Sequence, residues 1–172
     1  MKALKLNKSP GITLLELIIA LALILCIATT MFYYGSIAKR LFVRAEIEKL
    51  YALSLYVQRR AQIENVEHAL FFDDSNQSYR AVGQSEKLAD GVIFGFYAGV
   101  QGPPSQPTAL IKKPITFVDK KIIFYPDGTI SSGTVYITDE ARSCLYALTS
   151  GIAQVAHLRR YRYESEKWHF IE

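Results

Sequence analysis

Side chains capable of acid–base, nucleophilic or metal chemistry are few in this sequence and stand apart from one another. No histidine belongs to a cluster with zinc-ligand spacing, so the sequence predicts no metal site and no cofactor; the histidines are His68, His157 and His169. The G-x-S-x-G, H-E-x-x-H and glycine-rich phosphate-loop patterns are also absent. The sequence therefore favours a protein that is not an enzyme.

Two pairs of adjacent acids and two cysteines could still suggest catalysis. The pairs Asp73–Asp74 and Asp139–Glu140 lie in polar segments, which favour solvated, turn-forming side chains over a catalytic dyad. Cys144 lies in an expected strand and is interpreted as a small buried hydrophobe. Cys26 lies in an apolar run, where it would face lipid or neighbouring helices. Two cysteines in such different surroundings predict no disulfide framework.

The acid with the most unusual surroundings is Glu16. It is the only charged residue between positions 12 and 34, and about 20 apolar residues suffice to cross about 30 Å of hydrocarbon. The sequence therefore predicts a membrane-spanning helix over residues 12–35. A carboxylate there costs on the order of 2.5–3.5 kcal/mol, and no basic residue lies one turn away within the span. A free α-amine on a neighbouring copy would pair with Glu16 if the chain began at Ile12.

The charges around this span are distributed unevenly. The first eleven residues carry Lys2, Lys5 and Lys8 and no acid, and without them 17 basic residues face 16 acidic ones. The positive-inside rule then places the N-terminus in the cytoplasm, although three cations beyond the span, Lys39, Arg40 and Arg44, oppose this orientation. An ordinary N-terminal membrane anchor is the simplest alternative.

Residues 11–17, GITLLEL, resemble the class III signal of type IV prepilins and type II secretion pseudopilins. The resemblance implies that a prepilin peptidase removes residues 1–11 by cutting after Gly11, and that Ile12 is then N-methylated. Glu16 becomes the fifth residue, which in this family contacts the N-terminal amine of an adjacent subunit. The family usually begins with Phe or Met, and this chain has Ile12.

The rest of the chain predicts a helix followed by strands. Over residues 36–64, apolar or small residues recur every three or four positions and define one helix face: Val43, Ile47, Leu50, Ser54, Val57 and Ala61. Residues 65–172 alternate short β-rich runs with turns, which predicts an antiparallel head domain. The expected strands are 68–72, 78–82, 91–97, 115–118, 121–125, 134–138, 144–148 and 152–156, and residues 99–108 are an expected exposed loop. The predicted fold class is α+β, with a long N-terminal helix packed on an antiparallel sheet.

The second half of the head resembles the minor pseudopilin H and FimT-like group, which shows an F-x-P-x-G turn followed by further glycines. The matching residues are Phe124, Pro126, Asp127, Gly128, Gly133 and Gly151. The resemblance implies a pilin-like subunit of a type II secretion pseudopilus, held once across the inner membrane with a periplasmic head and then assembled into a filament. Its partners would be the prepilin peptidase, inner-membrane lipid, other pilin or pseudopilin subunits and a secreted substrate.

A cation-rich segment near the C-terminus leaves a second function open. In residues 157–163, HLRRYRY, a strand would place Arg160 and Arg162 on one face and Arg159 on the other with two tyrosines. Cations neutralise phosphates and rings stack on bases, so this segment is a candidate nucleic-acid contact, as in FimT-like minor pilins that take up DNA. A solvated edge strand is the other interpretation. A peripheral enzyme on a plain anchor is a third class.

Overall fold

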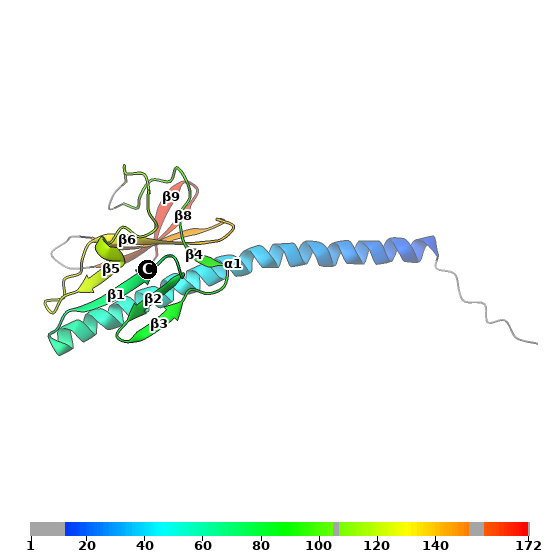
Figure 1. Ribbon diagram of the computed structural model, residues 1–172. Helices are drawn as coiled ribbons and strands as arrows, with labels where there is room; N and C mark the ends of the chain where they lie inside the picture. The colour runs from blue at the N-terminus through cyan, green and yellow to red at the C-terminus, as the bar shows by residue number, and fades with distance from the viewer. Residues whose placement is uncertain (1–12, 105–106, 152–156, 172) are drawn as a thin grey trace, which may run out of the picture. The chain divides into compact units, whose positions relative to one another are not determined.

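The computed structural model describes residues 13–104, 107–151 and 157–171, without the side chains of residues 30–38. Within these residues one α-helix, α1 (Leu14–Glu64), precedes nine β-strands and a short 3-10 helix, η1 (Val118–Lys120) (Figure 1). The chain divides into two compact units between Ile37 and Ala38. The α+β class, with a helix packed against antiparallel sheets, is confirmed.

A polar cap marks the start of α1. The Thr13 Oγ1 accepts a hydrogen bond from the backbone N–H of Glu16 at 3.3 Å, and the Thr13 carbonyl accepts one from the N–H of Leu17 at 3.2 Å. In the part of the chain that the structure describes, no helix combines the length and apolarity needed to cross a membrane. The predicted span includes Ile12 and the side chains of residues 30–35, which lie outside the described residues.

The C-terminal part of α1 supplies one side of the core of the second unit. All six residues of the predicted face, Val43, Ile47, Leu50, Ser54, Val57 and Ala61, are 0% exposed. The five apolar members share one core with strand residues that include Leu70, Ile122, Val135 and Leu148. Fully burying one such aliphatic side chain stabilises a fold by about 1.5–3 kcal/mol, so this apolar face is a main contribution to the docking of α1. The predicted end of the helix at Glu64 is confirmed.

The strands form two antiparallel sheets. The first has the order β3-β2-β1-β5 and the second the order β4-β6-β7-β8-β9. The strands of the first sheet are β1 (His68–Asp73), β2 (Ser78–Ala81), β3 (Gln84–Lys87) and β5 (Lys121–Phe124). Those of the second are β4 (Val92–Phe94), β6 (Gly133–Asp139), β7 (Leu145–Ser150), β8 (Leu158–Glu164) and β9 (Lys167–Ile171).

Most of the predicted strands are present, with three corrections. Residues 115–118 form only an isolated bridge, Ile115 to Val135, because the chain then turns through η1, where Asp119 has a positive φ of 52°. Residues 91–97 shorten to β4 (Val92–Phe94). The loop 99–108 is not wholly exposed, because Gly102 and Pro103 are buried. The predicted strand 152–156 lies outside the described residues.

Strands β3 and β9 were not predicted. All four side chains of β3 are exposed and polar, so the strand has no apolar alternation to reveal it. It pairs with β2 through a tight hairpin in which Val82 and Gly83 have positive φ angles of 51° and 75°. Such a pair of φ values is typical of the two-residue turns whose twist matches that of the flanking strands.

Candidate assembly site

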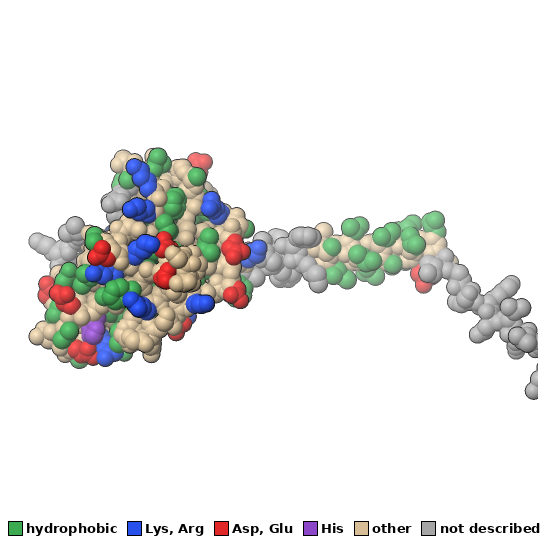
Figure 2. Space-filling model, viewed as in Figure 1, with side chains coloured by type: hydrophobic (Ala, Val, Ile, Leu, Met, Phe, Trp, Pro, Cys, Tyr) green, Lys and Arg blue, Asp and Glu red, His purple; other side chains and the backbone are tan. Residues whose placement is uncertain are grey.

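The first turn of α1 places Glu16 within an apolar surface. Hydrophobic side chains from Leu14 to Ile27 are between 52% and 79% exposed, and they lie on all sides of the helix. Figure 2 shows green side chains along this part of the chain, with the acidic colour at its N-terminal end. Glu16 forms no ion pair with any described residue. Gly11 and Ile12, the predicted cleavage and methylation positions, lie outside the described residues.

This surface has a large apolar area that remains exposed to water. Because these leucines and isoleucines are 52–79% exposed, burying each would release about 1–2 kcal/mol, so the segment as a whole favours lipid or other apolar helices by on the order of 10 kcal/mol. In either environment an ionised carboxylate is costly unless a cation or a set of N–H groups faces it. Among apolar helices that pack against this segment, one that brings a positive charge to the level of Glu16 would therefore bind more tightly.

The structure also gives Glu16 a local role that the sequence analysis missed. Thr13 and Glu16 have the Thr-x-x-Glu spacing of a capping box, and the Thr13 half of that box is formed. An acid in the first turn also interacts favourably with the positive end of the helix dipole, by about 0.3–1 kcal/mol. The signal was present in the sequence as a threonine three residues before a glutamate at the start of an apolar run. Any test of Glu16 must separate this capping from pairing between molecules.

The three arginines of the candidate nucleic-acid contact lie on two faces of β8, as the alternation predicted. Arg160 faces α1: its guanidinium lies 4.2 Å from the ring centre of Tyr51 and pairs with Glu48, and only 11% of its side chain is exposed. Arg162 shares this face, has 45% of its side chain exposed and pairs with Glu164. Arg159 is exposed on the opposite face. The strand therefore does not present the three cations as one surface.

The Pro-Asp-Gly turn fixes the end of β5 against the helix. Within the turn, Asp127 Oδ1 accepts hydrogen bonds from the backbone N–H and the hydroxyl of Thr129, at 2.8 and 2.6 Å. Gly128 has a φ of 86°, and its carbonyl accepts a hydrogen bond from Gln58 Nε2 of α1 at 2.9 Å. These contacts give the turn residues a structural role in holding the first sheet to α1.

A second glycine of the same motif is required by packing. A Cβ placed on Gly133 would lie 2.5 Å from the Phe117 ring, so the start of β6 has no room for a side chain. By contrast, a Cβ on Gly151 would meet no atom within 4 Å. Local packing therefore explains the glycine at position 133 but not the glycine at position 151.

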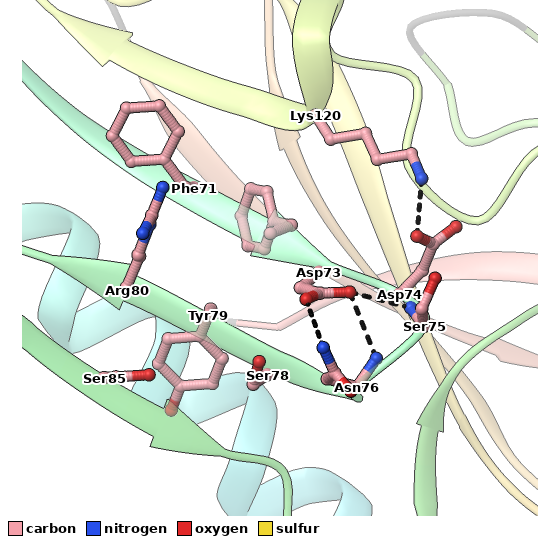
Figure 3. Close-up of a pocket in the computed structure, with 11 residues that line it drawn as sticks. Phe71, Asp73, Asp74, Ser75, Asn76, Ser78, Tyr79, Arg80, Ser85 and Lys120 are labelled. Carbon is pink, nitrogen blue, oxygen red and sulfur yellow. Dashed lines mark hydrogen bonds and ion pairs between the residues drawn. The ribbon is translucent and has the colours of Figure 1, made fainter.

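The acid pair Asp73–Asp74 lines a polar cavity of about 500 Å³ on the first sheet. Figure 3 shows Asp73 turned toward Asn76, whose side-chain amide donates to Asp73 Oδ2 at 2.7 Å, and Asp74 turned toward Lys120, with 2.5 Å between Nζ and Oδ1. The hydrogen bonds from the side chain and backbone of Asn76 lower the pKa of Asp73. Both carboxylates have structural partners, and the turn predicted for DDSNQ, residues 73–77, is confirmed over 74–77.

The second acid pair requires a correction. Asp139 was expected to be solvated, but it is 1% exposed. Its Oδ1 accepts from the backbone N–H groups of Ser143 and Cys144, at 2.6 and 3.1 Å, and closes the turn between β6 and β7. Burial alone would raise the pKa of Asp139, but the donors of Cys144 and Ser143 outweigh it and the net pKa is lowered. Burial and the nearby Asp139 raise the pKa of the Cys144 thiol to about 11.

One buried acid was not singled out from the sequence. Glu46 is 8% exposed, and its Oε2 has no hydrogen-bond partner among the described residues. Burial raises its pKa, while Lys49 and the N–H of Ala89 act in the opposite direction. Lys49 is engaged with Glu86 of β3, with 2.7 Å between Nζ and Oε2. Glu46 lies three residues after the buried Val43, so it has the helical spacing of the core face.

No protein-family model, curated protein or solved structure matches this chain. The candidate site consists of an apolar helical surface, one acid in its first turn and a capping threonine. Chemically, the site offers hydrophobic contact area and one negative charge for pairing. These are the properties of an assembly surface.

Proposed function

We propose that the protein is a structural subunit of the pilin type, a minor pseudopilin that assembles into a type II secretion pseudopilus. In this proposal a prepilin peptidase cuts after Gly11, Ile12 becomes the methylated N-terminus, and the helix beginning at Leu14 holds the subunit in the inner membrane and later in the filament. The observation that carries the proposal is an apolar helical surface, exposed on all sides, whose one acid lies in the first turn behind a basic leader.

The physical basis is the cost of charge in an apolar bundle. When helices pack side by side, Glu16 is removed from water and its cost must be offset by a positive charge at the same level. The amine created by cleavage before Ile12 lies four residues from Glu16, about one helical turn, so the amine of a neighbour shifted along the filament can reach it. Pairing in this low-dielectric setting would discriminate sharply between correct and incorrect axial registers.

The head supports a binding role for proteins more than one for nucleic acid. Arg160, which the DNA-uptake alternative requires, is held between Tyr51 and Glu48 with 11% of its side chain exposed. The remaining cations of β8 lie on opposite faces, and Arg162 pairs with Glu164. We therefore favour contacts with other subunits or a secreted substrate, with the head in the periplasm.

The mass of the membrane-extracted protein tests the proposed processing. Loss of residues 1–11 together with the addition of one methyl group is expected. A chain that keeps its first eleven residues while supporting secretion fully would be an ordinary anchored protein, and the proposal would be wrong.

Three variants test the role of Glu16. Glu16→Gln keeps a side chain that can complete a capping box but removes the charge, so it should insert normally and fail to enter filaments. Thr13→Ala removes the cap, at a cost of about 1 kcal/mol, yet keeps the charge and should still assemble. Glu16→Ala removes the charge and the side chain that could complete the box but keeps the backbone N–H that Thr13 caps, and it should behave as Glu16→Gln. Filaments are sheared, and incorporation is measured by immunoblotting. Assembly of Glu16→Gln at the native level would show that the charge does not select the register.

A further inference from the structure

The second unit begins with a ring of exposed cations and hydrophobic side chains on α1. Lys39, Arg40 and Arg44 are exposed, and Leu41 and Phe42 are 58% and 54% exposed. None of the three cations forms an ion pair with a described residue. Large hydrophobic side chains beside Lys and Arg are typical of helix segments that lie at a membrane interface.

These residues surround the helix instead of forming one stripe. Successive side chains on an α-helix point about 100° apart, so residues 39–42 point in four directions. The side facing the core is taken by Val43 and Ile47, which are both fully buried. Residues 39–44 extend about 7.5 Å along the axis, and the headgroup layer of a bilayer is about 5–8 Å thick on each side. A ring of this height fits a helix that crosses the interface.

The acids in the next turn do not neutralise this ring. Glu46 is 8% exposed and faces the core, and Glu48 pairs with Arg160. The positive charge of residues 39–44 is therefore available to an external anion. Between Glu16 and Lys39 there are 22 uncharged residues, which as an α-helix extend about 33 Å, close to the thickness of the hydrocarbon core.

We propose that residues 39–44 form a collar that binds the anionic headgroups of the membrane surface. Lys39, Arg40 and Arg44 contact lipid phosphates, while Leu41 and Phe42 insert at the boundary with the acyl chains. The position of the collar rests on the proposed function, in which the preceding segment spans the membrane. The collar holds the head at a fixed depth until the subunit leaves for the filament. It also gives a role to the three cations that oppose the positive-inside rule.

The collar is tested with residues 38–172, a compact unit with its own core, and lipid vesicles in a flotation assay. Vesicles contain phosphatidylcholine with or without phosphatidylglycerol. Each cation near an anionic surface changes the partition coefficient roughly fivefold, so K39Q/R40Q/R44Q should lower binding to anionic vesicles by roughly 100-fold. L41S/F42S should also lower it, and raising salt from about 0.05 to 0.5 M should weaken binding by the wild type.

The matched control removes three exposed lysines elsewhere on the same unit, K87Q/K112Q/K113Q. This variant has the same net charge as the collar variant, so binding near the wild-type level is expected. An equal loss in both variants, or full binding by L41S/F42S, would overturn the collar. Inorganic phosphate should compete no better than sodium chloride of equal ionic strength, and stronger competition would identify a soluble-anion site instead. The assay contains neither Gly11 nor Glu16, so its result does not depend on processing or assembly.

Discussion

Arg160 offers the sharpest test of whether the cations of β8 serve the fold or a ligand. Its guanidinium lies 4.2 Å from the ring centre of Tyr51, and its side chain, 11% exposed, also pairs with Glu48. Arg160→Met keeps most of the buried stem but removes the charge. A desolvated cation–π contact contributes about 0.5–2 kcal/mol. Because 38% of the Glu48 side chain is exposed, the ion pair adds only about 0.2–1 kcal/mol.

The expected destabilisation of Arg160→Met is therefore about 1–2 kcal/mol. In a unit of this size it would lower the Tm by roughly 3–10 °C. Urea unfolding of residues 38–172 can be followed through Trp168, the only tryptophan in the chain. A double-mutant cycle with Tyr51→Leu isolates the cation–π contribution, and a coupling energy of about 0.5–1.5 kcal/mol is expected.

Arg159→Met is the matched control, because it makes the same substitution on the opposite, exposed side of the strand. Its effect on the free energy of unfolding should stay within about 0.5 kcal/mol. Equal stability of the two variants, or a cycle with no coupling, would refute the structural role of Arg160. In that case Arg160 would become available as a nucleic-acid contact. The same measurement also shows whether a loss of DNA binding by an Arg160 variant would be due to partial unfolding.

Three further outcomes are expected of the same unit. Gly133→Ala should lower the free energy of unfolding by about 1–3 kcal/mol because its Cβ would meet the Phe117 ring at 2.5 Å, whereas Gly151→Ala should change it little in the same urea titration. Burial raises the folded-state pKa of Glu46, so the stability from its neutral form is complete below the ordinary pKa of 4.5 and is lost as pH rises through the folded pKa. Glu46→Gln should remove this pH dependence and raise stability at pH 7 by on the order of 1 kcal/mol, and an unchanged pH profile would contradict the assignment. The Cys144 thiol, with its pKa raised to about 11, should react with a disulfide reagent at about pH 8 only when the unit unfolds, so rapid labelling of the folded unit would show that it is not buried.

The helix could be predicted from the sequence because its core contacts repeat with the helical period. Six positions between Val43 and Ala61 were expected on one face, and all six are fully buried. The strands with alternating apolar residues were predictable for the same reason, since the side-chain period of a strand follows directly from its geometry. The Asp-rich turn at 73–77 was predictable because aspartate and asparagine side chains hydrogen-bond the local backbone.

The parts that the sequence did not predict depend on contacts between distant residues. Strand β3 has only polar, exposed side chains, so its composition does not indicate that it pairs with β2. The burial of Asp139 depends on backbone donors presented by the turn that follows it. In the same way, Arg160 belongs to the core face because β8 pairs with β7 opposite Leu148, a register that one sequence does not reveal.

The two halves of α1 differ in how much apolar surface they expose, and the proposed assembly would explain why their sequences differ. After Ala38 the fully buried positions follow one stripe, because one side of the helix contacts the sheets, whereas other apolar residues such as Leu41 and Phe42 stay exposed. From Leu14 to Ile27 the large apolar side chains are exposed on every side, and under the proposed function lipid or other helices would surround this segment. A substitution in the core of the head should therefore change the unfolding of residues 38–172 without affecting insertion of the apolar segment. A substitution at Glu16 should have the opposite pattern, leaving the stability of the head unchanged while altering the association of helices.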